Sequence, residues 1–384
     1  MPALRQKLSQ IDDYPAFLNA CWQEHLAPRA ADAPTVISTF AGAGGSSLGY
    51  SMAGFRELLA VEWDDNAVAT FKLNFPDVPV YHGDIAKLSV EDVLQRTGLQ
   101  PGQLDVFDGS PPCQGFSTAG KRDFYDDRNQ LFREYVRLLR GLRPRVFVME
   151  NVSGMVKGKM KLVFAEILRE LKASGYRVSA RLLNAMYFNV PQSRERMIFV
   201  GVREDLGIEP SHPQAESVPV PVKQVIPGCA ATWSQRINPW IDADRSAATI
   251  CKMDAGYEVL QITQDNLKEA EIRQTWQMYR VLTGVEKHKH FGLVRLDANQ
   301  PAATITKDAG NTTTGMIHPF EIRKLTIPEI KRLASFPDDF QMIGDFKQRW
   351  ARIGNSVPPL FMRSVALHIR REILSKTPVL LSSD

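Results

Sequence analysis

Short apolar segments alternate with longer amphipathic ones from residue 34 to about residue 203, a pattern typical of strands and helices that follow one another. The apolar segments predict strands over residues 35–40, 58–62, 80–81, 104–108, 145–150, 177–183 and 197–202. The amphipathic segments predict helices over residues 131–142 and 162–174, a helix capped by Ser46 or Ser47, and one from the cap Asp64 towards Asn74. This alternation favours an α/β fold with a parallel, doubly wound sheet.

The alternation of strand and helix patterns ends near residue 203, and the amino-acid composition changes there. Residues 204–325 hold many prolines and scattered Trp, Tyr and Arg without a strand–helix rhythm, so they predict a second, smaller domain. Residues 1–33 form an N-terminal extension, and residues 34–203 form the larger domain. A helical pattern returns over residues 326–384, and we expect its apolar face to pack back on the larger domain.

The composition is that of a soluble globular protein: 384 residues, of which 44% are apolar and 23% charged. No apolar run is long enough to span a bilayer, and the first residues lack a secretory signal pattern, so we expect a cytoplasmic protein. Four scattered cysteines fit neither a disulfide framework nor a zinc site, so no metal is expected. The net charge of +4 is compatible with a polyanionic partner without indicating one.

A stiff loop follows the predicted strand that ends at residue 108. Its sequence, SPPCQGFS, contains two successive prolines, which remove backbone donors and fix φ, and a glycine that permits a sharp turn. The loop therefore presents Cys113 at the carboxyl end of a strand, the edge where open α/β sheets bind ligands. Glu150 and Asn151 end the next strand, so a thiol and a carboxyl group would face one pocket. A buried structural cysteine and a capping or surface glutamate are the alternative interpretations.

A glycine-rich turn, FAGAGGSSLG, follows the first predicted strand, and Glu62 ends the second. Such a turn lets a ligand approach the backbone, while an acid after the second strand can accept hydrogen bonds from both ribose hydroxyls. Ser47 stands where a dinucleotide-binding motif has its last glycine, which favours a nucleoside without a pyrophosphate over NAD. Asp84, after the third strand, is placed to bind an adenine amino group. An ordinary strand–helix turn and a simple Asp-Gly turn are the alternatives.

Two further patterns indicate contacts with an anion. Arg194 and Arg196 lie two residues apart in QSRER, so on an extended chain they point the same way and could hold a carbonyl or an anion. Residues 205–320 interleave basic side chains with Trp and Tyr, a composition that suits nucleic acid, although no base-reading residue can be named. A solvated charged surface is the alternative for both patterns.

From Thr35 to about Leu374, the chain resembles the cytosine-5 DNA methyltransferases of restriction-modification or orphan type. The resemblance is carried, in order, by FAGAGGSSLG, AVEWD, HGDI, DGSPPCQGFS, DRNQLF, FVMENV, QSRERMIFVG and RIGNSVPP. It implies a two-domain α/β architecture, S-adenosylmethionine as methyl donor and a cytosine flipped out of duplex DNA as substrate. Residues 204–325 match in position only, as expected of the part that selects the target site.

The resemblance also implies a role for each matching residue. Cys113 would attack carbon 6 of cytosine, and Glu150 would hold and protonate ring nitrogen 3 beside the amino group. Arg196, with Arg194, would bind the base carbonyl and a nearby phosphate. The cofactor site would be lined by Phe40, Gly42, Gly44, Gly45, Glu62, Trp63, Asp84, Ile85, Pro112, Leu131, Asn355 and Ser356. The DNA would be contacted by Gln114, Ser117, Lys121 and Arg122, the last two on a loop that closes over it.

We expect double-stranded DNA as the partner of a monomeric enzyme, no membrane partner, and a cognate restriction endonuclease, where there is one, that acts separately. A tRNA cytosine-5 methyltransferase shares the catalytic set, but PPCQGFS and the long variable region favour DNA. A catalytically silent DNA-binding relative would have lost the cysteine, the glutamate or the cofactor residues, and none is lost. An amino-methyltransferase would carry an aromatic residue where Cys113 stands.

Overall fold

The computed structural model describes residues 8, 10–112, 130–156, 160–226, 248–250, 260–262, 293–307, 315–319 and 324–377. Contacts within the chain divide it into two compact units. The sheet unit comprises residues 20–188, 194–215 and 357–384, and the second unit comprises residues 1–19, 189–193 and 216–356. No helix in the described part of the chain is both long enough and apolar enough to cross a membrane.

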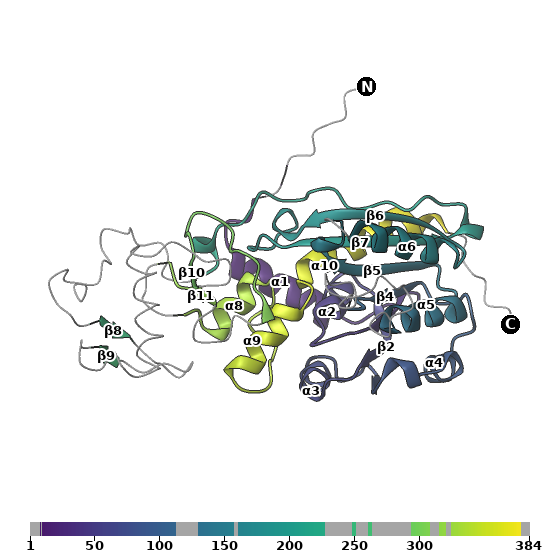
Figure 1. Ribbon diagram of the computed structural model, residues 1–384, viewed down its shortest axis with the longest axis horizontal. Helices are drawn as coiled ribbons and strands as arrows, with labels where there is room; N and C mark the ends of the chain where they lie inside the picture. Colours follow the sequence, from purple (N-terminus) through teal and green to yellow (C-terminus); the bar gives the residue numbers. More distant parts are fainter. Residues whose placement is uncertain are drawn as a thin grey trace, which may run out of the picture. The chain divides into compact units, whose positions relative to one another are not determined.

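The sheet unit is built on a seven-stranded sheet with the strand order β3-β2-β1-β4-β5-β7-β6 (Figure 1). Its strands are β1 (Thr35–Thr39), β2 (Arg56–Glu62), β3 (Val80–His82), β4 (Val106–Gly109), β5 (Val146–Val152), β6 (Tyr176–Asn184) and β7 (Glu195–Arg203). Each of these strands was predicted from the apolar pattern, and the doubly wound α/β class is confirmed.

The sheet is mixed, so the predicted parallel pairing is confirmed for β1 to β5 and was wrong for β7. Strands β3, β2, β1, β4 and β5 pair in parallel, whereas β7 runs antiparallel to both β5 and β6. A parallel connection needs a crossover of a dozen or more residues. Only residues 185–194 join β6 to β7, so β7 returns antiparallel to β6 and occupies the place between β6 and β5.

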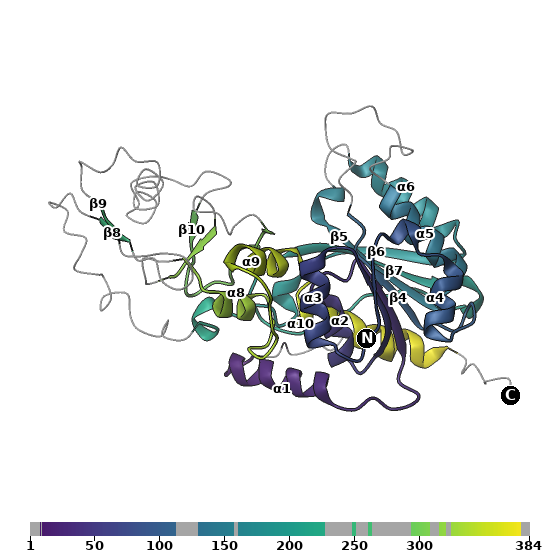
Figure 2. The same cartoon turned by 90° about the horizontal axis from the view of Figure 1, so that it is seen from below.

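Helices cover both faces of this sheet (Figure 2). On one face lie α2 (Gly45–Met52), α3 (Asp65–Asn74) and α10 (Pro359–His368), and on the other lie α4 (Val90–Thr97), α5 (Gln130–Leu142) and α6 (Met160–Lys172). A Cβ atom at Gly49 of α2 would lie 2.6 Å from the Cβ of Met362 in α10, so only glycine allows the two helices to approach this closely. The single-turn elements of the sheet unit are η1 (Ile85–Lys87), η4 (Ser153–Val156), η5 (Ala185–Tyr187), η6 (Glu204–Leu206), η10 (Ile369–Ile373, a π-helix) and η11 (Leu374–Lys376).

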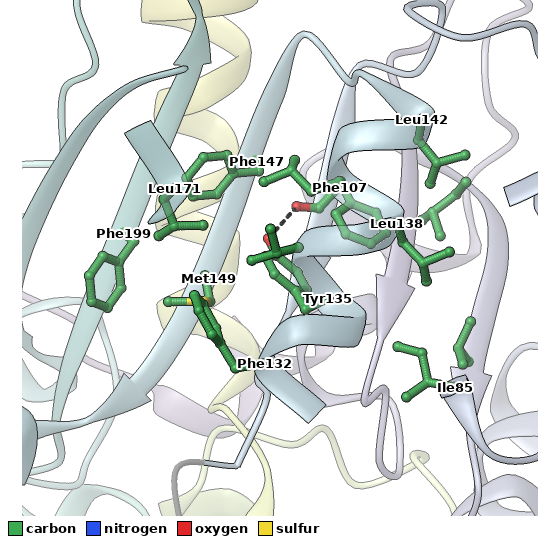
Figure 3. Close-up of a cluster of buried hydrophobic side chains, with 14 of the residues drawn as sticks. Ile85, Phe107, Phe132, Tyr135, Leu138, Leu142, Phe147, Met149, Leu171 and Phe199 are labelled. Atoms are coloured by element: carbon green, nitrogen blue, oxygen red, sulfur yellow. Dashed lines mark hydrogen bonds between the residues drawn. The ribbon is translucent and has the colours of Figure 1, made fainter. Parts of the chain in front are cut away.

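Apolar side chains fill the space between the sheet and helices α4, α5 and α6 (Figure 3). The rings of Phe107 and Tyr135 stack with their centroids 4.9 Å apart, and Phe147 meets Tyr135 edge to face. The Tyr135 hydroxyl lies 3.4 Å from the Phe107 carbonyl and 3.3 Å from the Val148 carbonyl. This cluster holds β4 beside β5, the two strands that lead to the candidate catalytic residues.

The helix starts show where local sequence signals succeeded and failed. Asp64 caps α3 as predicted, because its carboxylate accepts the Ala67 N–H at 2.9 Å. Ser46 and Ser47 are not caps, because α2 begins earlier, after Gly44, whose φ of 95° is a left-handed conformation that favours glycine. Helix α4 was not predicted, although the capping box formed by Ser89 and Asp92 is a readable signal.

The second unit contains shorter elements. They are η7 (Val222–Gln224), β8 (Ala248–Ile250), β9 (Leu260–Ile262), β10 (Leu293–Arg295), β11 (Gly315–Ile317), α8 (Ile327–Leu333) and α9 (Phe346–Asn355), while α1 (Tyr14–Leu26) contributes residues to both units. Strand β10 pairs with β11 in parallel, and β8 pairs with β9 antiparallel. The predicted return of helix near residue 326 is confirmed by α8, which Thr326 and Glu329 cap reciprocally.

Two carboxyl groups of the sheet unit, those of Asp108 and Glu57, accept hydrogen bonds from side chains of α2. The Tyr50 hydroxyl donates to the Asp108 carboxyl group at 3.1 Å, and the Ser47 hydroxyl donates to Glu57 at 2.9 Å. Burial raises the pKa of Asp108 well above its usual range, with Glu57 and Glu150 adding to the effect. Burial also raises the pKa of Glu57 to about 7, against the lowering effect of hydrogen bonds from Ser38 and Ser47.

We predict that Glu57 makes the stability of the protein fall as the pH rises. Its carboxyl group keeps a proton in the folded chain up to about pH 7, while the unfolded chain releases that proton near pH 4.5. The free energy of unfolding, measured by urea titration, is compared between Glu57→Gln and the wild type at pH 5 and at pH 8. The difference between the two proteins should shift in favour of Glu57→Gln by roughly 1–3 kcal/mol over this range.

The prediction concerns the difference in unfolding free energy between Glu57→Gln and the wild type. The absolute stability is not suited to the test, because two histidines change it with pH in the opposite direction. Burial lowers the pKa of His25 and that of His212 to about 4, so these two side chains make stability rise between about pH 4 and pH 6.5. Glu91→Gln, at an exposed position of α4, is the control and should show no such trend. A pH-independent difference between Glu57→Gln and the wild type would contradict the prediction.

Candidate active site

The carboxyl ends of the parallel strands lie at one edge of the sheet, and the predicted site residues of the sheet unit follow them. Phe40 comes directly after β1, Glu62 ends β2, and Asp84 follows β3. Pro112 follows β4 closely, and Glu150 lies near the end of β5. The sheet therefore brings the predicted cofactor residues and the predicted acid to the same edge, where open α/β sheets bind ligands.

An ion pair joins β5 to β7 at this edge. Oε1 of Glu150 lies 2.6 Å from Nε of Arg196, and both side chains are largely buried, with 10% and 14% of their surface exposed. In the antiparallel register Glu150 stands opposite Ile198 and Arg196 opposite Val152, so the charged residues are diagonal neighbours on one face. A charge removed from water in this way is stable only when it is paired and hydrogen-bonded.

Arg194 lies two residues before Arg196 and is fully buried, with 3% of its surface exposed. The pKa of Arg194 is lowered to about 9, mostly by burial and in part by the positive charge of Arg196, while the negative charge of Glu150 opposes the shift. The Arg194 guanidinium therefore keeps its charge at neutral pH. Beside β5 and β7 the two arginines, Arg194 and Arg196, outnumber the one carboxylate, Glu150, and this local positive charge suits a carbonyl or an anion.

Asn151 connects the end of β5 to the segment that follows β4. Its side-chain Nδ2–H donates to the Pro111 carbonyl at 3.0 Å, and its Oδ1 accepts the Val152 N–H at 2.9 Å. Pro112, the last described residue before the gap, is exposed, and Leu131 is half-buried at the start of α5. The predicted residues that lie outside the described part of the chain are Cys113, Gln114, Ser117, Lys121 and Arg122.

The glycine turn after β1 has an unusual backbone. Phe40 has a φ of 56°, which is strained for a residue with a side chain, and Gly42 and Gly44 have φ values of 56° and 95°. A Cβ atom at Gly44 would lie 2.4 Å from the Phe75 ring, whereas a Cβ at Gly42 would meet no atom within 4 Å. Gly45 is buried as the first residue of α2. The turn is thus packed on one side and open at Gly42.

Glu62 is fixed by three backbone N–H groups. Its Oε2 accepts the Gly42 N–H at 2.7 Å, and its Oε1 accepts those of Trp63 at 2.9 Å and Asp64 at 3.0 Å. A carboxylate has about four acceptor positions, so about one is left for a ligand hydroxyl. The side chain of Trp63, next in the chain, is 75% exposed and offers a flat apolar face.

Asp84 is exposed, and its carboxylate caps η1 by accepting the Ala86 N–H at 3.0 Å, while Ile85 is buried. The Gly83 N–H donates to the Glu62 carbonyl at 3.0 Å, which holds Asp84 near the end of β2. Asn355 and Ser356 lie in the second unit at the end of α9, and their place at a cofactor site stays a prediction.

One polar residue near the end of β4, Asp108, was not singled out from the sequence. Asp108 receives the Tyr50 hydroxyl, and the Thr39 hydroxyl donates to the Asp108 carbonyl at 3.0 Å. An aspartate inside the apolar strand VFDG is a signal that could have pointed to this buried network. The network ties β4 to β1 and to α2, the helix that begins at the glycine turn.

Comparisons with known proteins agree with this geometry. The family model of the C-5 cytosine-specific DNA methylases matches residues 34–371. The Type II methyltransferase M1.HphI of Haemophilus parahaemolyticus is 34% identical over 341 residues, covering 86% of this chain and 85% of the relative. The Type II methyltransferase M.XorII of Xanthomonas oryzae pv. oryzae is 31% identical over 367 residues, covering 89% and 86%.

A solved structure is similar over nearly the same extent. The crystal structure described as that of a DNA modification methyltransferase encoded within an E. coli prophage superposes with a TM-score of 0.63 at 26% identity, covering 88% of this chain and 99% of that one. The resemblance predicted from the sequence motifs is confirmed. The chain therefore belongs to the family of C-5 cytosine-specific DNA methylases and is a DNA cytosine methyltransferase.

Proposed function

We propose that the protein transfers a methyl group from S-adenosylmethionine to carbon 5 of a cytosine flipped out of a specific duplex DNA site, through a covalent adduct with Cys113. The observation that carries this proposal is the buried Glu150–Arg196 ion pair at the end of β5, beside the segment after β4 that leads to Cys113. An acid held in place next to a segment that leads to a thiol is suited to covalent addition with proton transfer.

The edge near β1 and β2 fits the proposed cofactor. The backbone of the turn is open at Gly42, the remaining acceptor position of Glu62 suits a ribose hydroxyl, and the exposed ring of Trp63 suits stacking on an adenine. Asp84 would accept the adenine amino group, and the remaining predicted cofactor residues keep that role as proposals. S-adenosylmethionine supplies, when bound, an electrophilic methyl group on a sulfonium.

The chain's own residues then account for the activation of the base. Carbon 5 of cytosine is a poor nucleophile, and addition of the Cys113 thiolate to carbon 6 makes it electron-rich by forming an enamine. Glu150 uses Oε1 for Arg196. Its Oε2 carries the proton that is donated to ring nitrogen 3 as the thiolate adds. After methyl transfer, a general base accepts the proton of carbon 5 and the sulfur–carbon 6 bond breaks, which releases the Cys113 thiolate. Ring nitrogen 3 then returns its proton to Glu150, and the aromatic base is restored.

The DNA has to deform before this chemistry takes place. Extrusion of the cytosine from the duplex costs a few kcal/mol of lost stacking and pairing, which the pocket must offset. Arg196 in β7, with Arg194 just before the strand, would bind the base carbonyl and a nearby phosphate. Residues 204–325 would read the target sequence. The Type II relatives support a restriction-modification role. In this proposal the enzyme acts as a monomer, and any cognate endonuclease acts separately.

We predict that expression of the protein methylates cytosines at one short plasmid sequence, which bisulfite sequencing of the recovered plasmid will identify. Cys113→Ser should leave no methylated cytosine above background, because a hydroxyl is a much weaker nucleophile at neutral pH than a thiolate. Full methylation by Cys113→Ser would overturn the covalent mechanism, and methylation of tRNA alone would overturn the DNA substrate.

We predict that Glu150→Gln lowers the rate of methyl transfer about 10²- to 10⁴-fold, the range expected for loss of a general acid. The dissociation constant for S-adenosylmethionine, measured by calorimetry, should not change. The matched control is Glu134→Gln in α5, where Glu134 and Arg137 form an ion pair with the same 2.6 Å separation away from the strand edge. Equal rates for the two variants would remove the acid role from Glu150.

We predict that Glu62→Ala weakens binding of S-adenosylmethionine about 10- to 100-fold, because a hydrogen bond to a carboxylate is lost. The substitution also releases three backbone N–H groups of the turn. Asp65→Ala removes a carboxylate that is 96% exposed and serves as the control for a general loss of negative charge. A dissociation constant for Glu62→Ala equal to that of the control would contradict the assignment.

A further inference from the structure

The side-chain amide of Asn151 is used at both ends by backbone groups. Nδ2 donates to the Pro111 carbonyl and Oδ1 accepts the Val152 N–H, so the amide cannot turn without breaking a hydrogen bond. The side chain is buried, with 5% of its surface exposed. Loss of one partner of a buried hydrogen bond leaves the other unsatisfied, which makes this orientation of Asn151 strongly preferred.

The anchored carbonyl controls the backbone that leads to Cys113. The Pro111 carbonyl belongs to the planar peptide bond between Pro111 and Pro112, so holding its oxygen holds that plane. The ring of Pro112 fixes φ near −65°. Between the anchored plane and the peptide bond of Cys113, the only soft backbone dihedral is therefore ψ of Pro112.

The start of this segment is held as firmly. The Thr39 hydroxyl donates to the Asp108 carbonyl, and the Tyr135 hydroxyl lies between the carbonyls of Phe107 and Val148. A Cβ atom at Gly109 would lie 2.4 Å from Oγ1 of Thr39, so the strand end is also packed without spare space. The hydrogen bond from Asn151 to the Pro111 carbonyl adds a further anchor, two residues before Cys113 in the sequence.

We propose that Asn151 is a positioning residue that aims the Cys113 thiol at carbon 6 of the flipped cytosine by holding the Pro111–Pro112 peptide plane. This inference rests on the proposed function, in which Cys113 is the nucleophile. Asn151 itself touches neither the base nor the cofactor in this proposal. A misplacement of about 1 Å can cost about 10²-fold in rate, so the anchor is expected to act on the rate of attack and not on binding.

The test uses Asn151→Asp in the full chain. The substitution keeps the size of the side chain and an oxygen for the Val152 N–H, but it places an acceptor against the Pro111 carbonyl. The substrate is a duplex with 5-fluorocytosine at the target site found by bisulfite sequencing. The fluorine on carbon 5 cannot be removed by a base as the proton is, so elimination is blocked and the adduct persists. We expect adduct formation to slow about 10- to 100-fold, with unchanged dissociation constants for DNA and for S-adenosylmethionine.

A pH profile provides a second readout that a merely structural role would not move. A protonated carboxyl group can again donate to the Pro111 carbonyl, so the rate of Asn151→Asp relative to the wild type should recover as the pH falls. Asn151→Ala removes the amide without adding a charge and should stay slow at every pH. If Asn151→Asp does not fold, Asn151→Ala carries the test through its rate and its binding constants.

The matched control is Tyr176→Phe. The Tyr176 hydroxyl donates to the Pro144 carbonyl at 2.8 Å, so this variant also loses a buried hydrogen bond to a proline carbonyl, but at the opposite end of β5. It should keep the wild-type rate of adduct formation. A wild-type rate in both Asn151 variants, or an equal loss in Tyr176→Phe, would overturn the inference while the proposed function stands. Adduct formation by Cys113→Ser would overturn both.

Discussion

A carboxylate buried at the end of an apolar strand requires a cationic partner, and in this chain the direction of one strand supplies it. Because β7 runs antiparallel to β5, its first residues lie at the edge where the parallel strands end. Arg196 therefore meets Glu150, and Arg194 lies close by. A parallel β7 would place both arginines at the opposite edge of the sheet, and Glu150 would be left as a buried, unpaired charge.

Strand positions could be predicted from the sequence because apolar segments between polar turns report burial. Strand direction could not, since a pattern of apolar residues has no polarity, and only the short connection over residues 185–194 indicated it. The glycine turn and Glu62 were found through their spacing. The three N–H groups bound to Glu62 were not, because they depend on the positive φ values of the turn and on contacts with Gly42, 20 residues earlier. Asn151 was noticed for its place beside Glu150, but its bond to Pro111 spans 40 residues.

The candidate site is organised largely by backbone groups of its own strands. Glu62 is oriented by N–H groups of two loops, and Asn151 by a carbonyl and an N–H from two strand ends. Behind them, the bond between Tyr50 and Asp108 links the helix after the glycine turn to the strand before Pro111. These hydrogen bonds fix the side chains before the substrates bind, so little reorganisation is needed during binding and reaction. For a displacement between two bound molecules, such positioning is the main contribution of the protein.

The packing of α10 on α2 has a consequence for synthesis of the chain. The guanidinium of Arg370 donates to the Ala53 carbonyl across 317 residues of sequence, and Arg363 pairs with Glu24 across 339. Until α10 has left the ribosome, the apolar face of α2 that Met362 covers has no native partner. Contacts of such long range form late and slowly. The sheet unit thus passes through a half-covered state during translation, in which chaperone binding or premature association competes with folding.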